Sequence, residues 1–156
     1  MIVIADTSPL NYLRLIDAVQ VLPTLYGSVV IPEEVRQELL HPDTPEIVRA
    51  WAAKLPEWVI VQQPQSLLPL PLDAGEIAAI SLAVETRADL ILIDERRGRR
   101  AAQSQHLAVT GTLGILANAA RIGLLDFAEA LAHLERTSFR ISPELVTALL
   151  DDQASE

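Results

Sequence analysis

Residues 2–10 read Ile-Val-Ile-Ala-Asp-Thr-Ser-Pro-Leu. The apolar run Ile2–Ala5 is too continuous to alternate with polar residues, which is typical of a strand buried on both faces of a parallel sheet. The run ends at Asp6, and Ser8-Pro9 then supplies a helix N-cap and a proline at the first helical position. We therefore predict that the chain turns directly from strand into helix. This leaves a carboxylate at the carboxyl edge of the sheet, where open α/β sheets bind ligands.

The same arrangement returns at residues 90–94, Leu-Ile-Leu-Ile-Asp, where a second apolar strand ends on a second aspartate. Strand-like and helix-like segments alternate along the chain, which predicts a three-layer α/β/α sandwich around a central, mainly parallel sheet. The predicted strands are 2–5, 28–31, 58–61, 90–93 and 107–110. The predicted helices are 10–16, 18–25, 32–40, 45–55, 77–86, 95–105, 113–122, 127–136 and a last one that starts at Ser142-Pro143.

Composition narrows the class of protein. The 156 residues predict one domain over residues 1–150 and a frayed tail over residues 151–156. The chain has no cysteine, which excludes disulfides and fits a reducing cytoplasm, where we expect the protein to act without an export signal or a membrane span. Its net charge of −9 argues against adhesion to nucleic acid through the whole surface. Aromatic residues are only 4% of the chain, so we expect nucleic-acid contacts to run mainly through phosphates.

Four carboxylates stand out by their placement. Asp6 and Asp94 lie at strand ends, Glu38 lies late in the helix after the second strand, and Glu76 lies in the first turn of an alanine-rich helix. Carboxylate oxygens suit a hard divalent cation, with Mg²⁺ or Mn²⁺ expected, and such an ion relieves their mutual repulsion. A cation of this kind polarises a phosphodiester and activates water. The four residues therefore indicate metal-assisted phosphodiester hydrolysis.

Each of the four also has a structural interpretation. Asp6 or Asp94 can end a strand by bonding to the following backbone amides, and Glu95 is an alternative ligand to Asp94. Glu38 stands among other glutamates, as on a solvated helical face. Asp73-x-x-Glu76 matches a capping box with Asp in place of the usual Ser or Thr, which by itself would explain both residues.

A basic cluster follows Asp94 directly and consists of Arg96, Arg97, Arg99 and Arg100. These guanidinium groups either clamp substrate phosphates or form a solvated helix start that offsets an acidic protein. Thr112 either caps its helix and presents amides to a phosphate, or caps the helix and nothing more. The three histidines have no metal-binding spacing.

Five segments together resemble the PIN-domain family, and in particular the branch of predicted PIN nucleases that is similar to VapC-type toxins. They are Ile4–Leu10, Ile31–Leu39, Leu72–Ile80, Leu92–Glu95 with Arg99 after it, and Val109–Gly114, and they span residues 2 to about 150. The resemblance implies a Mg²⁺- or Mn²⁺-dependent ribonuclease whose catalytic acids are Asp6, Glu38, Glu76 and Asp94. It also favours Arg99 as the phosphate-binding arginine. The chain departs from the commoner PIN pattern in having Gly75-Glu76 where an Asp usually begins that helix.

We accordingly expect an endoribonuclease of the toxin type. Asp6, Glu76 and Asp94 would bind the metal, and Glu38 would either bind it or orient the attacking water. The alternatives are a PIN-fold binding module that has lost turnover and acts through a protein partner, and a phosphotransfer enzyme with Asp6 as nucleophile. The last lacks the second Asp of the haloacid-dehalogenase signature, because Ser8 stands in its place.

Toxin-like relatives commonly pair with a small antitoxin protein and form dimers. By that resemblance we expect an RNA substrate, an antitoxin partner and a homodimer. The apolar faces of the early helices, with Leu13, Ile16 and Leu25, are candidates for the dimer contact.

Overall fold

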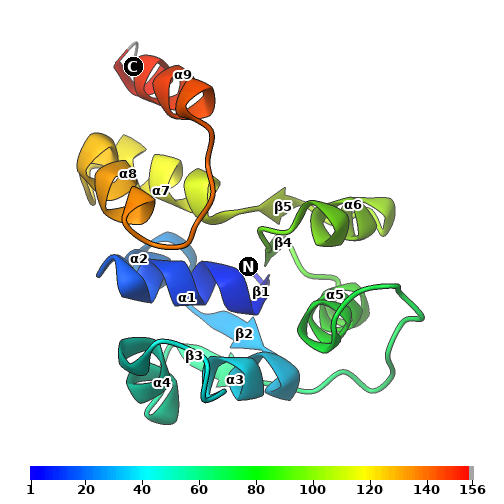
Figure 1. Cartoon of the computed structure of the whole chain (residues 1–156). Coiled ribbons are helices and arrows are strands. Elements are labelled where there is room, and N and C mark those ends of the chain that lie inside the picture. The colour runs from blue at the N-terminus through cyan, green and yellow to red at the C-terminus, as the bar shows by residue number, and fades with distance from the viewer. Residues whose placement is uncertain (155–156) are drawn as a thin grey trace.

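Five parallel strands form the centre of the molecule, in the order β3-β2-β1-β4-β5 over the part of the chain described, residues 1–154. Their bounds are β1 Val3–Ala5, β2 Val29–Ile31, β3 Val59–Val61, β4 Leu90–Leu92 and β5 Val109–Thr110. The computed structural model has helices on both faces of this sheet (Figure 1), which confirms the predicted α/β/α sandwich.

The helices divide between the two faces because successive strand residues point to opposite sides. Val3 and Ala5 of β1 belong to a core formed mainly with α1, α2, α3, α4, α7 and α8, whereas Ile4 packs with α5 and α6. The bounds are α1 Thr7–Leu15, α2 Val21–Tyr26, α3 Glu33–Leu39, α4 Glu46–Ala53, α5 Ala74–Thr86, α6 Arg96–Ser104, α7 Thr112–Arg121, α8 Phe127–Glu135 and α9 Pro143–Ala154. Over residues 1–154, none of these helices is long and apolar enough to cross a membrane.

Several boundaries differ from the prediction for local reasons. Pro32 and Pro45 have extended backbones and act as N-caps, so α3 and α4 each begin one residue later than expected. Strand β5 begins at Val109 because the Leu107 amide still donates to Ala102 of α6. Helix α5 begins at Ala74 with Asp73 as its N-cap, as the spacing of Asp73 and Glu76 predicts.

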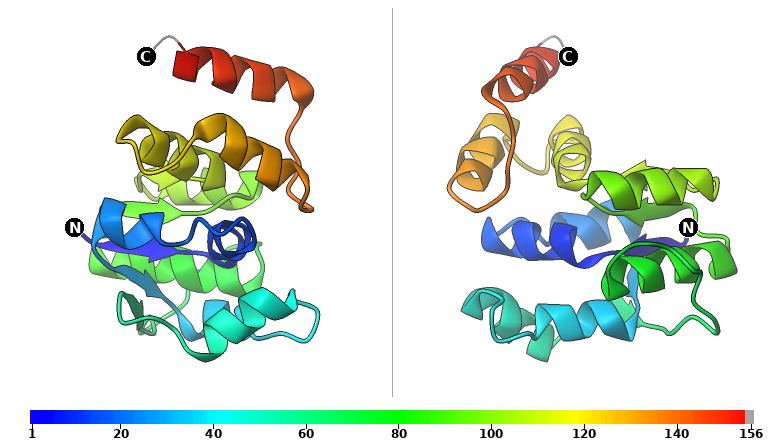
Figure 2. Two further views of the ribbon diagram at one scale, coloured as in Figure 1. Left: turned by 90° about the vertical axis from the view of Figure 1, so that its left-hand side faces the viewer. Right: turned by 45° about the vertical axis from the view of Figure 1, so that its right-hand side comes forward.

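The C-terminal helix α9 lies at the edge of the molecule, beyond α8 (Figures 1 and 2). The predicted frayed tail began at residue 151, but the chain stays helical through Ala154. The rest of that tail, residues 155–156, lies outside the described residues.

The predicted dimer contact through the early helices is wrong for two of its three residues. Leu13 is fully buried and Ile16 is nearly so, both in the core of this chain, because α1 covers the sheet. Leu25 packs partly against the same core. That apolar face is therefore used inside the chain.

Candidate active site

Asp6 and Asp94 come from neighbouring parallel strands. Strands β1 and β4 pair with Ala5 opposite Leu92, and the Asp6 amide donates to the Leu92 carbonyl at 2.9 Å. Asp6 follows β1 directly and Asp94 follows β4 after Ile93, so both leave the same carboxyl edge of the sheet. Asp6 occupies the N-cap position of α1, yet its side chain makes no capping hydrogen bond. The two strand ends therefore deliver two carboxylates to one edge, as predicted.

Glu38 reaches this edge from α3, the helix that follows β2. Its carboxylate accepts a hydrogen bond from the Thr7 hydroxyl of α1 and another, at 3.2 Å, from the Gly75 amide of α5. Glu38 is half-buried between the first turns of these two helices. It is thus part of the site, and the interpretation as a solvated helical face does not describe it.

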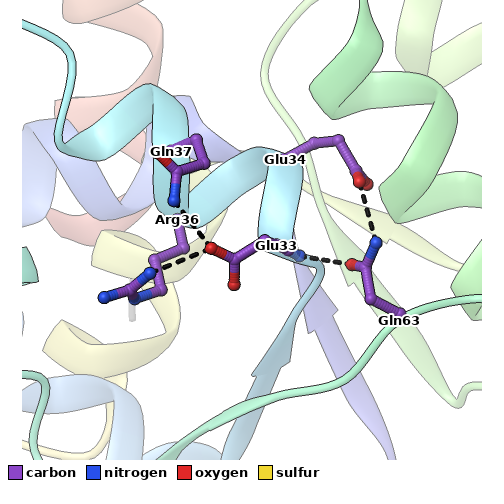
Figure 3. A network of polar contacts seen from close by, with 5 residues as sticks. All are labelled: Glu33, Glu34, Arg36, Gln37 and Gln63. Carbon is purple, nitrogen blue, oxygen red and sulfur yellow. Dashed lines mark hydrogen bonds and ion pairs between the residues drawn. The ribbon is translucent and has the colours of Figure 1, made fainter.

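The other glutamates of α3 serve a different purpose. Glu33 accepts hydrogen bonds from Arg36 and Gln37, and the Glu33 amide donates to Gln63 after β3 (Figure 3). Gln63 in turn donates to Glu34 at 2.9 Å. This network fixes the first turn of α3 to the segment that follows β3, and so fixes the direction in which Glu38 leaves the helix.

Asp94 is held by three hydrogen bonds. Its Oδ1 accepts from the Thr112 amide, and its Oδ2 accepts from the hydroxyls of Ser8 and Thr112, each at 2.7 Å. Thr112 is fully buried, and its amide and hydroxyl are both directed at Asp94. The structure therefore places Thr112 behind Asp94, where it positions the carboxylate, and it makes no side-chain cap to α7.

Glu76 is built differently from the other three acids. It forms the predicted capping box: its amide donates to Asp73 Oδ1 at 2.8 Å, and its Oε1 accepts from the Asp73 amide at 3.4 Å. Its Oε2 is buried and has no hydrogen-bond partner within the described residues. Glu76 thus lies against the site from behind, while the exposed Asp73 lines the cleft in front of it. Sequence reasoning assigned Asp73 only a capping role, and its position three residues before Glu76 was the available signal.

Glycines make room for three of these carboxylates. A Cβ on Gly75 would lie 2.5 Å from Glu38 Oε1, one on Gly98 would lie 2.5 Å from Glu76 Oε2, and one on Gly111 would lie 2.8 Å from Asp94 Oδ1. Distances below 3.0 Å force a shift of one of the two groups. A larger residue at any of these positions would displace the facing carboxylate from its present place. Sequence reasoning did not single out these three residues for this role.

The acids line an open cleft of about 660 Å³. Asp6, Glu38, Asp73, Asp94 and Glu95 lie on its walls, and the cationic side chains among its described lining residues are Arg96 and Arg140. Arg96 belongs to the predicted basic cluster. Arg99 is exposed and does not line the cleft, and Arg140, from the segment between α8 and α9, was not predicted.

The electrostatics of the cleft disfavour ionised acids. Burial raises the pKa of Asp6 well above its ordinary value, and Glu38, Glu76 and Asp73 raise it further, against the opposing effect of the Thr7 backbone. Burial also raises the pKa of Glu38, although the Thr7 hydroxyl lowers it. The pKa of Glu76 rises to about 7 through burial first and then through its contact with Asp73. The shifts come first from burial and then from neighbouring carboxylates, and both effects disfavour the ionised forms.

A divalent cation would favour the ionised forms. Asp6 is only 5% exposed, and its Oδ1 has no hydrogen-bond partner in the described chain, which is the condition of a carboxylate that binds an ion. Oxygen-only donors from Asp6, Glu38, Asp73 and Asp94 suit Mg²⁺ or Mn²⁺. Among the described residues, no group of three or more His, Cys, Asp or Glu side chains is arranged to hold a metal ion as it stands. The support for a cation is thus the chemistry of the donor set and the unpartnered Asp6 oxygen.

The chain is thus a parallel α/β sandwich with an acidic cleft at the carboxyl edge of its sheet. The family model described as a PIN domain matches residues 2–156, and the chain belongs to this family. PIN domains are generally nucleases, and PIN nucleases generally use divalent metal ions. Neither the curated proteins nor the solved structures contain a significant match to the chain.

Proposed function

We propose that the protein is a metal-dependent endoribonuclease of the toxin type, which hydrolyses RNA phosphodiester bonds with the help of Mg²⁺ or Mn²⁺ bound by carboxylates. The observation that supports this proposal is the meeting of Asp6, Glu38 and Asp94 in one cleft from three different elements. Glycines leave room for the carboxylates of Glu38 and Asp94, and the buried Thr112 amide donates a hydrogen bond to Asp94.

In this proposal the residues divide the work. Asp6 and Asp94 hold the cation, and Ser8 and Thr112 fix the direction of Asp94. The ion, when bound, polarises the phosphodiester and lowers the pKa of a water molecule. Glu38 orients that water and accepts its proton, for which its raised pKa suits it. Glu76, the remaining predicted metal ligand, supports the site through the cap of α5 and its charge.

The test combines Mn²⁺ calorimetry with RNA cleavage on the same samples. We expect Asp6→Asn and Asp94→Asn to abolish cleavage and to weaken Mn²⁺ binding at least tenfold, because each removes a ligand charge. Asp43→Asn is the matched control, since Asp43 is exposed and lies outside the cleft. Cleavage that survives EDTA, or that Asp6→Asn leaves intact, would overturn the proposal.

One observation favours the second candidate, a binding module that has lost turnover. One oxygen of the Glu76 carboxylate is engaged by the capping box, and Glu76 does not line the cleft. This candidate gains support if the protein binds Mn²⁺ and RNA yet leaves a broad RNA panel uncut.

The toxin assignment includes a small antitoxin as partner, a homodimer and a cytoplasmic setting. It rests on the resemblance and on the absence of cysteine. Light scattering at micromolar concentration tests the dimer, and a monomer would overturn it. Growth arrest upon expression, relieved by co-expression of the adjacent gene product, tests the toxin role.

A further inference from the structure

The wall of the cleft opposite the acids comes from the segment between α8 and α9. We name residues 137–142 of this segment the α8–α9 linker. In Figure 1 the linker runs beside α1, and its Ser138, Phe139 and Arg140 line the cleft together with Tyr12 of α1. The linker is thus part of the substrate-binding surface although it lies more than 40 residues after Asp94 in the chain.

The α8–α9 linker is fixed in place by several contacts. The hydroxyls of Tyr12 and Ser138 are hydrogen-bonded at 2.9 Å, and the rings of Tyr12 and Phe139 meet edge to face with centroids 5.0 Å apart. The Thr137 hydroxyl donates to Leu134 of α8 and accepts from the Phe139 amide at 3.1 Å. These contacts hold two aromatic rings side by side at the mouth of an acidic cleft.

The negative charge of the cleft requires positively charged side chains where a substrate would lie. Five carboxylates line it, and a phosphodiester approaching them is repelled unless positive groups receive its charge. Arg140 is exposed and makes no ion pair or hydrogen bond with the described residues, so its guanidinium is available. An unpaired arginine can bind a phosphate, and an aromatic ring next to it can stack on an unpaired base.

We propose that Arg140, Phe139 and Tyr12 form a binding wall for single-stranded RNA. Arg140 binds a backbone phosphate next to the one that is cleaved, and the ring of Phe139, held edge to face by Tyr12, stacks against a neighbouring base. A base held in a duplex cannot present its face to the rings, so the wall selects unpaired strands. The proposal rests on the nuclease function above and assigns the residues that hold its substrate.

Binding and cleavage are measured separately, so that the two proposals fail separately. The probe is a fluorescein-labelled single-stranded RNA of mixed sequence, and the same RNA annealed to its complement serves as the duplex. We expect Arg140→Gln to weaken binding of the single strand about tenfold, as the loss of a charged hydrogen bond implies. The slope of log K against log salt concentration should fall by about 0.7, the value for one phosphate contact on a single strand. Arg136→Gln is the matched control, because Arg136 is exposed at the end of α8 and does not line the cleft.

The aromatic pair is tested with Phe139→Leu, which keeps an apolar side chain against the core. We expect binding to fall roughly fivefold or more, as for loss of one stacked base, with an unchanged salt slope. A thermal melt confirms that the variant is folded, and Tyr12→Phe, which keeps the ring, should bind nearly as well as the unmodified protein.

Equal affinity and salt slope for Arg140→Gln and Arg136→Gln would overturn the phosphate contact. Equal binding of the single strand and the duplex would overturn the stacking role. Failure of the unmodified protein to bind RNA overturns the wall as a whole. The nuclease function is judged only by whether the unmodified protein cleaves RNA with Mn²⁺, so loss of cleavage with binding intact removes that function and leaves the wall standing.

Discussion

The substitution Glu76→Gln should stabilise the metal-free protein at pH 8 and leave it almost unchanged at pH 4. The side chain of Glu76 is 6% exposed, and its pKa rises from the ordinary 4.5 to about 7 in the folded protein, chiefly through burial and then through Asp73. Well below pH 4.5 the carboxyl is protonated in both the folded and the unfolded chain. As the pH rises from 4.5 to 7 the carboxyl ionises in the unfolded chain but stays protonated in the folded one, which favours unfolding.

The size of this effect follows from the shift. At 1.36 kcal/mol per pKa unit, the rise corresponds to about 3 kcal/mol of stability that is lost between pH 4.5 and pH 8. For a chain of this length that amount corresponds to roughly 5–10 °C in Tm. Glutamine mimics the protonated form and can still occupy the third position of a capping box, so the variant should keep this stability.

The assay is urea unfolding in EDTA at pH 4 and pH 8. Glu129→Gln is the matched control, because Glu129 holds the same position after the capping Asp126 of α8 and is exposed. Asp6 and Glu38 titrate in the same direction, so the difference between variant and unmodified protein is the informative quantity. A Glu76→Gln protein that is equally stable or less stable at pH 8 would refute the assigned burial of Glu76.

Three further predictions concern the support of the acids. Thr112→Val should lower Mn²⁺ affinity about tenfold in calorimetry, because Asp94 loses a buried hydrogen-bond donor. Thr112→Ser should keep the affinity, and equal affinity of Thr112→Val and the unmodified protein would contradict this role. Asp6→Asn should raise Tm in EDTA at pH 7 because burial raises the pKa of Asp6, so the ionised form destabilises the fold, and a lowered Tm would contradict it. Gly75→Ala should destabilise by about 1 kcal/mol in urea unfolding, because its Cβ would displace the Glu38 carboxylate from its hydrogen bond to the Gly75 amide. Glu38→Asp should recover part of the loss in the double variant, and additive losses would show that the two positions are not in contact.

The fold could be predicted from local sequence patterns because the burial of apolar residues determines both the pattern and the structure. An apolar run that ends on Asp6 or Asp94 is a buried parallel strand followed by a turn, and the sheet then brings both ends to one edge. The capping box at Asp73 and Glu76 was likewise visible, since its spacing lies within one helical turn. Both features depend either on residues close together in the sequence or on the regular pairing of parallel strands.

What sequence reasoning missed depends on contacts between distant segments. Tyr12 and Phe139 are 127 positions apart, and a low aromatic content gave no sign that the fold brings the two rings together. Arg140 stands outside the basic cluster, and so the nearer Arg99 was preferred. Gly98 lies between arginines in a helix and had no visible reason to be glycine until Glu76 was seen against it.

The acids of the cleft are held to different degrees, and this difference bears on how an ion would bind. Asp94 accepts three hydrogen bonds from Ser8 and Thr112, and Glu38 accepts two, so both are directed before any ligand arrives. Asp6 is buried with an oxygen that finds no partner in the described chain, so it has the most to gain from a cation. Asp94 and Glu38 would therefore be oriented before a cation binds, and the largest electrostatic gain on binding would come at Asp6. Uncompensated charge at the end of β1 therefore lowers the stability of the metal-free protein and, for the same reason, favours the binding of an ion.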